Sequence, residues 1–441
     1  MTTPGDIDSA LEALRARDPG AGQNAEAALE ALTAGEGFDH VNQHYLQYFL
    51  WYTLPKKFLM SLDVKLDIAR ALGNVLEDAG MPRYAAICHS DTTRGCIEAE
   101  EYGRGREYYL RAQKASGVEP PDTDLLVWGD VFGPSENAAL EGAASALEMA
   151  VVGGELSPGS SGWKGTQKRL TTAWLTAPNP GFDGEPPLDA IHSERMGSWM
   201  SSRSETKRRL LERLVGRLIS APGVSDEIEH AFAPLRWFLA RAEEGIPLTE
   251  KHNLGRAFVR EAAARWNWWD LRGQPMREDD VTPLWILHEY ASELKLVRRR
   301  GRKLVATPAG RRCQNDAEEL WHRVGRGLVA GQEFVDAVSE LTLAVLVLEG
   351  VAEADDIVTT ITPMLVEEGW GSGKEWGSRV FVDEEDVSAA MWDLRRKSIP
   401  FGLMVDREDW RDRSVALTEV GRATALDALW ARATAPQRGP Y

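Results

Sequence analysis

The chain has 441 residues, of which 43% are hydrophobic and 27% charged, so it can bury a sizeable core and is neither a disordered nor a collagen-like polymer. Its length corresponds to three domains of about 150 residues. The 51 basic and 68 acidic residues give a formal net charge of −17. This charge argues against nucleic-acid or anionic-membrane binding by the whole chain, unless a local basic patch overrides it.

Cysteine content and apolar segments predict a cytoplasmic protein that does not enter membranes. A small, odd number of cysteines is no disulfide framework and fits a reducing compartment. The first residues carry Asp6 and Asp8 and have neither the basic nor the apolar region of a signal peptide. The longest apolar stretch, near Leu341–Leu348, is too short to cross a bilayer. The three cysteines are Cys88, Cys96 and Cys313.

The spacing of apolar residues in the first third of the chain predicts an all-α domain over residues 1–152. Apolar residues recur there at spacings of three and four, as on one face of a helix. Glycine and proline interrupt the pattern at Pro55, at Gly80 to Pro82 and at Gly117 to Pro121. The expected helical stretches are Asp39–Thr53, Phe58–Ala79, Arg94–Ser116 and Pro134–Val152.

The glycine-rich segment Gly153–Gly165 is predicted to be a linker between this domain and a middle helical region over residues 166–245. A phosphate-binding loop is the alternative, but the motif needs Gly-Lys-Ser/Thr, and here Lys164 lies between Trp163 and Gly165. Residues 178–187 form a second break. The helices expected in the middle region are Gln167–Leu175, Leu188–Ser220 and Asp226–Glu243.

The second half contains an internal repeat. Leu304–Arg311 and Val415–Arg422 both end in Thr-x-x-Gly-Arg, at an offset of 111 residues. Each copy is preceded by a predicted helix and hairpin and followed by a helix that carries Leu-Trp. In each copy a threonine is placed to cap the next helix. The expected elements of the first copy are the helix Thr282–Leu294 and the strands Lys295–Arg299 and Lys303–Ala306; those of the second are the helix Glu384–Lys397, the strands Leu403–Val405 and Ser414–Leu417, and a charged turn, Asp406–Arg413.

Helix, hairpin and capped helix is the plan of a winged helix, and the Leu-Thr-x-x-Gly-Arg ending resembles the end of the wing in MarR- and PadR-type regulators. The resemblance implies two tandem winged-helix domains, over residues 246–330 and 333–441. The fold class expected is therefore mainly α, with an N-terminal helical domain followed by two winged-helix domains that each hold a small β-hairpin. The whole chain is also similar to a group of uncharacterised actinobacterial proteins, which supplies no activity. That similarity is carried by Gln47–Pro55, Gly117–Leu126, Leu188–Met200 and Gly245–Asn253.

Charge separates the two winged units. Residues 248–314 carry 14 basic and 8 acidic residues, whereas residues 333–441 carry 11 basic and 21 acidic residues. The predicted wing of the first unit concentrates five positive charges, and arginine donates bidentate hydrogen bonds to phosphate oxygens. We therefore expect phosphate contacts with double-stranded DNA there. The alternative is that these charges keep an exposed turn soluble or pair with acidic parts of the same chain. The candidate nucleic-acid-binding residues are Arg298, Arg299, Arg300, Arg302 and Lys303.

Two further groups of residues, one basic and one aromatic, are candidates for contact with a protein partner. Arg395, Arg396 and Lys397 end a predicted helix in the acidic unit, where protein contact is favoured over DNA. Trp268 and Trp269 are adjacent, so they cannot both face one core on a regular helix. They form either an aromatic platform for a base or a partner, or a packing surface between domains.

No catalytic, cofactor or metal motif is complete. Cys88, His89 and Cys96 lack a CxxC pair and a fourth zinc ligand. His192 and Glu194 match half of a deaminase signature whose P-C-x-x-C partner is missing. The leading hypothesis is a non-enzymatic DNA-associated or regulatory protein without a cofactor. The alternatives are a protein-interaction scaffold and an enzyme with an unrecognised motif, and the sequence does not indicate an oligomeric state.

Overall fold

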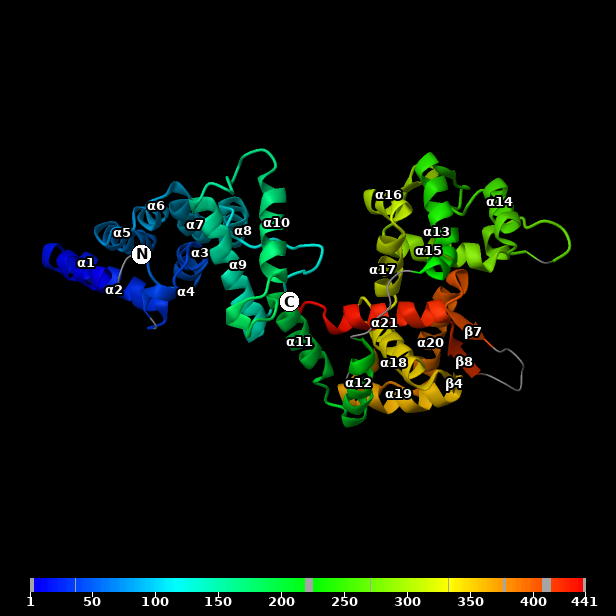
Figure 1. The fold of residues 1–441 in the computed structure, drawn as a ribbon. Helices are drawn as coiled ribbons and strands as arrows, with labels where there is room; N and C mark the ends of the chain where they lie inside the picture. The colour runs from blue at the N-terminus through cyan, green and yellow to red at the C-terminus, as the bar shows by residue number, and fades with distance from the viewer. Residues whose placement is uncertain are drawn as a thin grey trace. The chain divides into compact units, whose positions relative to one another are not determined.

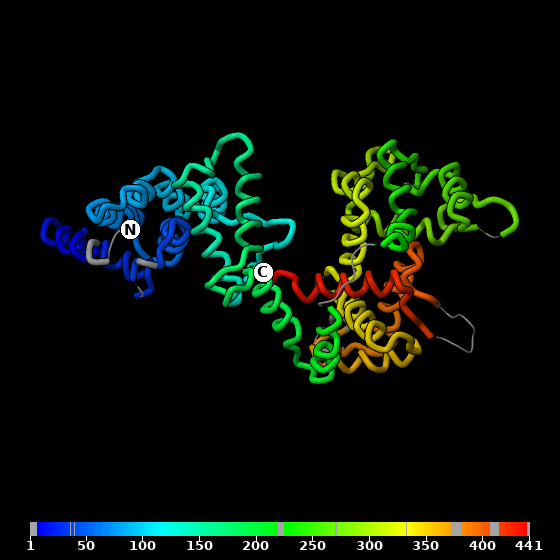
Figure 2. Tube along the Cα trace, in the orientation of Figure 1, coloured from blue at the N-terminus to red at the C-terminus, as the bar shows by residue number. Residues whose placement is uncertain are grey.

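The computed structural model describes residues 4–35, 37–218, 225–269, 271–331, 333–375, 378–406 and 414–438. The chain is mainly helical and divides into two compact units (Figure 1). Unit 1 comprises residues 1–194 together with 436–441, and unit 2 comprises residues 195–435. The trace in Figure 2 runs from blue to green over residues 1–194 and from green to red over residues 195–435. The expected middle region is thus divided between the two units.

The described part of unit 1 consists of helices and loops. Its longest helices are amphipathic, and α5 packs against α1, α2 and α6. The elements are α1 (Pro4–Arg17), α2 (Pro19–Thr33), η1 (Phe38–His40), α3 (Gln43–Tyr48), the π-helical turn η2 (Phe49–Thr53), α4 (Leu54–Lys57), α5 (Leu62–Asp78), α6 (Pro82–Cys88), α7 (Asp91–Glu101), α8 (Gly105–Ser116), α9 (Pro134–Val152), α10 (Trp163–Thr176), η3 (Pro180–Phe182) and the first part of α11 (Pro187–Met200), which continues into unit 2 from Arg195.

Two helices expected to be continuous are broken. The predicted stretch Arg94–Ser116 contains the break between α7 and α8, where Gly103 has a φ of +67°, a left-handed conformation that suits glycine. The predicted stretch Leu188–Ser220 contains the break between α11 and α12, at Ser201 to Ser204; its last two residues lie outside the described residues. Serine side chains bond to nearby backbone and favour such ends, and Ser204 Oγ accepts from the Lys207 amide at 3.3 Å.

The described part of unit 2 adds small antiparallel sheets to its helices. Its elements are α12 (Glu205–Leu218), α13 (Asp226–Glu244), β1 (Ile246–Pro247), α14 (Arg256–Trp266), η4 (Glu278–Asp280), α15 (Thr282–Glu293), β2 (Val297–Arg300), β3 (Lys303–Ala306), α16 (Pro308–Asn315), α17 (Ala317–Gly327), α18 (Phe334–Glu349), β4 (Val351–Glu353), α19 (Ala354–Glu368), β5 (Gly371–Glu375), β6 (Ser378–Phe381), α20 (Glu384–Ser398), η5 (Ile399–Phe401), β7 (Met404–Asp406), β8 (Ser414–Leu417) and α21 (Glu419–Ala433).

Unit 2 contains two repeats that each begin with a helix, a strand, two helices and a hairpin; two helices follow the hairpin in the first repeat and one in the second. The first repeat, α13 to α17, has a three-stranded sheet in the order β1-β3-β2, and the second repeat, α18 to α21, has one in the order β4-β8-β7. In each, the first strand pairs with the last, and two helices lie between the first and second strands. The second repeat also carries the hairpin β5–β6. Most of the charged turn expected in the second copy, residues 407–413, lies outside the described residues.

The Thr-x-x-Gly motif makes the same contacts in both repeats. Thr307 and Thr418 are the expected caps: their hydroxyls accept from the Gly310 and Gly421 amides at 3.1 and 2.9 Å. The same hydroxyls donate to the carbonyls of Lys295 and Gly402, at 2.8 Å in each case. The motif therefore ties the start of a helix to the chain that enters the hairpin, which explains why it recurs.

The two repeats share one hydrophobic core. Buried residues from both belong to a single cluster that extends from α12 to α21. Phe401, which follows α20, stacks on Phe232 of α13 at a centroid distance of 4.9 Å. Trp321 of α17 donates its indole N–H to Thr424 of α21 at 2.9 Å. Unit 2 is thus one packed body rather than two independent repeats.

No helix in the described ranges has both the length and the apolar character that a membrane span requires.

Candidate functional site

The arginine hairpin, β2 and β3 with their turn, presents the basic residues that the sequence singled out. β2 is an edge strand, and Arg298, Arg299 and Arg300 pair through their backbones with β3. Val297 and Leu304 anchor the hairpin in the core, whereas the three arginine side chains are exposed. Within the described ranges, no side chain forms an ion pair or a side-chain hydrogen bond with any of these three arginines. Their charges are therefore available to an external anion.

The remaining two basic residues of the hairpin differ from these three. Arg302 donates to Glu250 Oε1 at 2.9 Å, although both side chains are mostly exposed. Lys303 is exposed, and its aliphatic stem passes Gly245 closely enough to contact a Cβ placed there. An ion pair this exposed contributes little energy and can be exchanged for a phosphate contact. The hairpin therefore has three arginines without an ion pair, followed by two further exposed cations, of which Arg302 is in an exposed ion pair.

Helix α15, which precedes the arginine hairpin, packs against α20 of the second repeat. Lys397 Nζ lies 2.9 Å from Glu293 Oε1 and 3.0 Å from Asp393 Oδ2. Arg396 forms ion pairs with Glu289 and, at 2.7 Å, with Asp393. Burial opposes ionisation of Asp393, but its hydrogen bonds to the two cations outweigh that effect, and the pKa of the carboxyl falls below its usual value. The acidic residues of α15 are thus neutralised by the second repeat.

Aromatic rings complete this contact between the repeats. The Arg396 guanidinium lies 5.0 Å from the centroid of Trp285 and 5.6 Å from that of Trp392. Lys397 lies 5.4 Å from the centroid of Tyr290, which is buried. Cations over aromatic faces are attracted by the ring quadrupole. Two of the residues expected to meet a separate partner, Arg396 and Lys397, therefore contact the first repeat of the same chain.

The third basic residue of that set, Arg395, is half-buried on α20. The two tryptophans of the other set follow the end of α14. Asn267 adopts a left-handed conformation with a φ of +52°, so Trp268 and Trp269 no longer follow helical geometry. Both rings are half-buried against the core of unit 2, and Trp269 donates its indole N–H to the Gly273 carbonyl at 3.2 Å. Their adjacency reflects a helix end rather than a platform on a continuous helix.

Of the residues considered as zinc ligands, the two cysteines lie in the core of unit 1, whereas His89 is exposed. Cys88 and Cys96 are buried in one apolar cluster. Burial raises the pKa of the Cys88 thiol to about 12 and that of Cys96 to about 11. In the part of the chain that the structure describes, no group of three or more His, Cys, Asp or Glu side chains is arranged to hold a metal ion.

Sequence reasoning missed a polar cavity in unit 1. It has a volume of about 500 Å³ and lies between η2, α8, α9 and the loop after α8. His44, Tyr48 and Tyr52 lie close together in the sequence, and Gln113 and Glu119 follow 60 or more residues later. Two segments that contribute to its lining, Gln47–Pro55 and Gly117–Leu126, are among those that carry the similarity to the actinobacterial protein group. No local spacing brings these residues together, so only the fold reveals the site.

Comparison with known proteins finds a family-model match in unit 2. The family model described as the Y4jL N-terminal domain matches residues 230–319, which run from within α13 to within α17 and include the arginine hairpin. No curated protein and no solved structure matches the chain. The similarity to the Y4jL N-terminal domain therefore lies in the first repeat.

Proposed function

We propose that the two repeats of unit 2 are winged-helix domains and that the chain is a non-enzymatic, DNA-associated protein. The arginine hairpin of the first repeat would be the wing that contacts phosphates. The proposal rests on the three exposed arginines, Arg298, Arg299 and Arg300, which have no side-chain partner in the described ranges. A protein with a net charge of −17 that collects positive charge at one exposed edge has a local surface suited to a polyanion.

The topology supports the winged-helix part of the proposal. In the first repeat a helix, a short strand, two helices and a hairpin follow one another, and the first strand joins the sheet beside β3. This is the arrangement that the helix–hairpin–capped-helix plan implies. The second repeat has the same order. We therefore assign the same fold to both.

The contacts of α15 favour binding without base readout. Glu289 and Glu293 are held by Arg396 and Lys397, and a helix that carries acidic residues next to a second helix is a poor reader of base edges. Phosphate contacts position a protein on DNA but carry no sequence information. We expect affinity that depends strongly on salt and weakly on sequence.

The test is fluorescence anisotropy of a mixed-sequence DNA duplex titrated with the full chain from low to physiological salt. If three phosphate contacts are lost in the triple variant Arg298/Arg299/Arg300→Ala, the salt slope should fall by about 3 and binding at low salt should weaken by more than tenfold. Two duplexes of unrelated sequence should bind alike.

A charge-matched control separates a local contact from global electrostatics. Arg17, Arg70 and Arg94 lie on the surface of unit 1, each in an exposed ion pair. Their replacement by alanine removes the same three charges and should leave DNA binding almost unchanged. Equal losses in both triple variants, or no binding by the wild type at low salt, would reject the wing as a DNA contact.

A protein-interaction scaffold is the second candidate. The specific observation in its favour is that α15 already makes a helix–helix contact with α20, using the surface with which such a domain would meet DNA. In that case the acidic second repeat would select a basic partner through charge. A reducing cytoplasm is the compartment that we propose for either function, because Cys88, Cys96 and Cys313 are unpaired and buried.

A further inference from the structure

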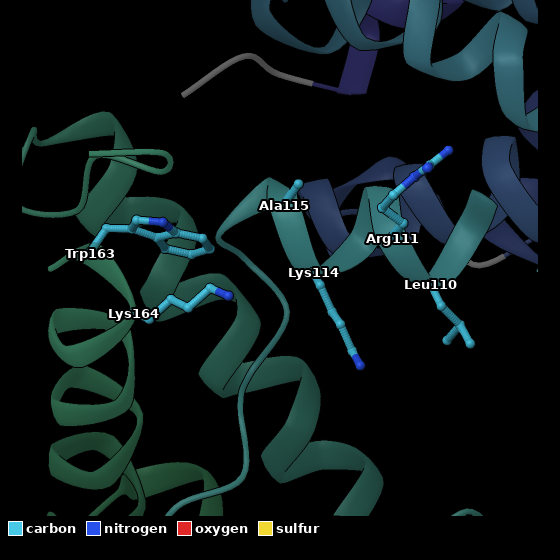
Figure 3. A pocket seen from close by; sticks show the side chains of 6 residues that line it. All are labelled: Leu110, Arg111, Lys114, Ala115, Trp163 and Lys164. Atoms are coloured by element: carbon cyan, nitrogen blue, oxygen red, sulfur yellow. The ribbon is translucent and has the colours of Figure 1, made fainter. Parts of the chain in front are cut away.

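The polar cavity of unit 1 continues into neighbouring hollows. A second cavity of about 630 Å³ shares Glu119, Asp130 and Phe132 with it, and a third shares Lys114 and Lys164 with the second. Figure 3 shows the third: Lys114 from α8 and Lys164 from α10 extend into the same gap beside Trp163. Volumes of this size are typical of small-molecule sites.

The positive charges without a carboxylate partner distinguish this site. Three carboxylates line these cavities: Glu119 lies 2.7 Å from His44, Asp130 pairs with Arg438 at 3.2 Å, and Asp122 accepts from the Trp128 amide at 3.0 Å. In the described ranges, Arg106, Lys114 and Lys164 take part in no ion pair. Arg106 and Lys114 are two turns apart on α8, so they lie on one face of that helix. The charge left to a ligand is therefore positive.

An aromatic wall adjoins these cations. Tyr48 and Tyr52 stack at a centroid distance of 5.3 Å, and Tyr109 lies 5.3 Å from Tyr52. Tyr48 and Phe132 are 36% and 38% exposed, so each still offers a ring surface. The π-helical turn η2 contributes Tyr52, and such turns occur often at functional sites. A flat, aromatic ligand group could stack there.

Polar atoms lie at the base of the same cavity. His44 Nε2 is 2.7 Å from Glu119 Oε2 and 3.3 Å from the side-chain amide of Gln113, which is buried. Gln167 of α10 is also buried, and its amide donates to the carbonyls of Gly117 and Glu119 at 3.0 and 2.8 Å. This second glutamine fixes the loop that carries Glu119. The hydrogen-bonding groups are thus held in place before any ligand arrives.

We propose that unit 1 binds a nucleotide in this cavity. The base would stack on the tyrosine wall and hydrogen bond to the His44–Gln113–Glu119 group, and the phosphates would meet Lys114 and Lys164. The three features required by a nucleotide, an aromatic face, directional hydrogen bonds and unpaired cations, come together here. This inference concerns unit 1 and does not depend on DNA binding by unit 2.

The experiment is isothermal titration calorimetry of the full chain with ATP, adenosine and inorganic tripolyphosphate, in the background of the Arg298/Arg299/Arg300→Ala variant so that the wing cannot bind phosphate. We expect one ATP per chain and at least about tenfold weaker binding of adenosine and of tripolyphosphate alone, because each lacks half of the contacts.

Variants test separately the residues proposed to bind the phosphates and those proposed to bind the base. Lys114→Gln with Lys164→Gln should weaken ATP about tenfold or more and leave adenosine unchanged, since charge-assisted hydrogen bonds are lost. Tyr48→Leu should weaken the binding of both ATP and adenosine, because both would stack on the tyrosine wall. Lys57→Gln is a control for the loss of a single surface charge, because Lys57 is exposed and does not line the cavity. Absence of saturable ATP binding, tripolyphosphate binding as tight as ATP, or indifference to all the cavity variants would overturn the proposal.

Discussion

Lys397 of α20 places its ammonium group 2.9 Å from the carboxylate of Glu293 on α15, which joins the second repeat to the first. Asp393, one turn earlier on α20, lies 3.0 Å from the same ammonium group. The lysine is 14% exposed and the glutamate 49%, so the pair lies at the margin of the contact between the helices. This position makes it a sensitive reporter of whether the two helices remain packed in solution.

Reversal of this pair should reveal the contact. Glu293→Lys brings two ammonium groups together and should lower the free energy of unfolding, whereas adding Lys397→Glu should restore part of the loss. For a partly exposed pair we expect a coupling energy of about 0.5–1 kcal/mol in a double-mutant cycle measured by urea unfolding. The exposed pair Arg302–Glu250, also 2.9 Å apart, is the matched control and should show almost no coupling. Equal coupling in both cycles would contradict a specific α15–α20 contact.

The same cluster predicts a pH dependence of stability. The folded-state pKa of Asp393 is lowered, so its stabilising contribution is present above its unfolded pKa, about 4, and is lost as pH falls toward the folded value. Lys397 has a raised pKa: burial lowers it, but the hydrogen bonds to Glu293 and Asp393 outweigh burial. Its contribution is complete below about pH 10.4, the unfolded value, and is lost as pH rises through the folded pKa.

Hydrogen exchange of α15 and α20 measured at several pH values would test this dependence. Between pH 5 and 9 the wild type should protect these helices more than Asp393→Asn does. Below about pH 4 the difference should shrink, because Asp393 takes up a proton in the unfolded chain at a higher pH than in the folded chain. A difference that stays constant down to pH 3 would mean that Asp393 acts through packing rather than through its charge.

Features set by neighbouring residues could be predicted from the sequence. The strands on both sides of Gly301 and the caps at Thr307 and Thr418 follow from turn and capping chemistry that acts within four residues. The helical character of the first third followed in the same way from apolar periodicity. The break between α7 and α8 was missed because a single residue, Gly103, ends a pattern that otherwise continues.

Features that join distant segments could not be predicted. Arg396 and Glu289 are 107 residues apart, and no spacing indicates that they meet. The same holds for His44 and Glu119 in the cavity of unit 1. The basic residues of the hairpin were identified by composition alone. Whether they were paired depended on the fold, because acidic side chains elsewhere in the chain could have neutralised them.

The repeated glycines give the sharpest test of the fold of unit 2. A Cβ at Gly310 would lie 2.1 Å from the Leu296 carbonyl oxygen, and one at Gly421 would lie 1.7 Å from that of Leu403. Because the obstructing atoms are backbone, no rotamer change can relieve them. Gly310→Ala and Gly421→Ala should each lower the free energy of unfolding by about 1–3 kcal/mol, measured by urea unfolding.

Gly216→Ala is the control for these glycines. Gly216 is exposed within α12, and a Cβ there would meet nothing within 4 Å. Alanine at this position should raise stability by roughly 0.5–1 kcal/mol, because it reduces the conformational freedom of the unfolded chain. The opposite signs expected at Gly216 and at the two motif glycines rule out a general effect of adding a methyl group. If Gly310→Ala and Gly421→Ala raised stability as Gly216→Ala is expected to do, the close approach of the motif to the hairpin would be refuted in both repeats.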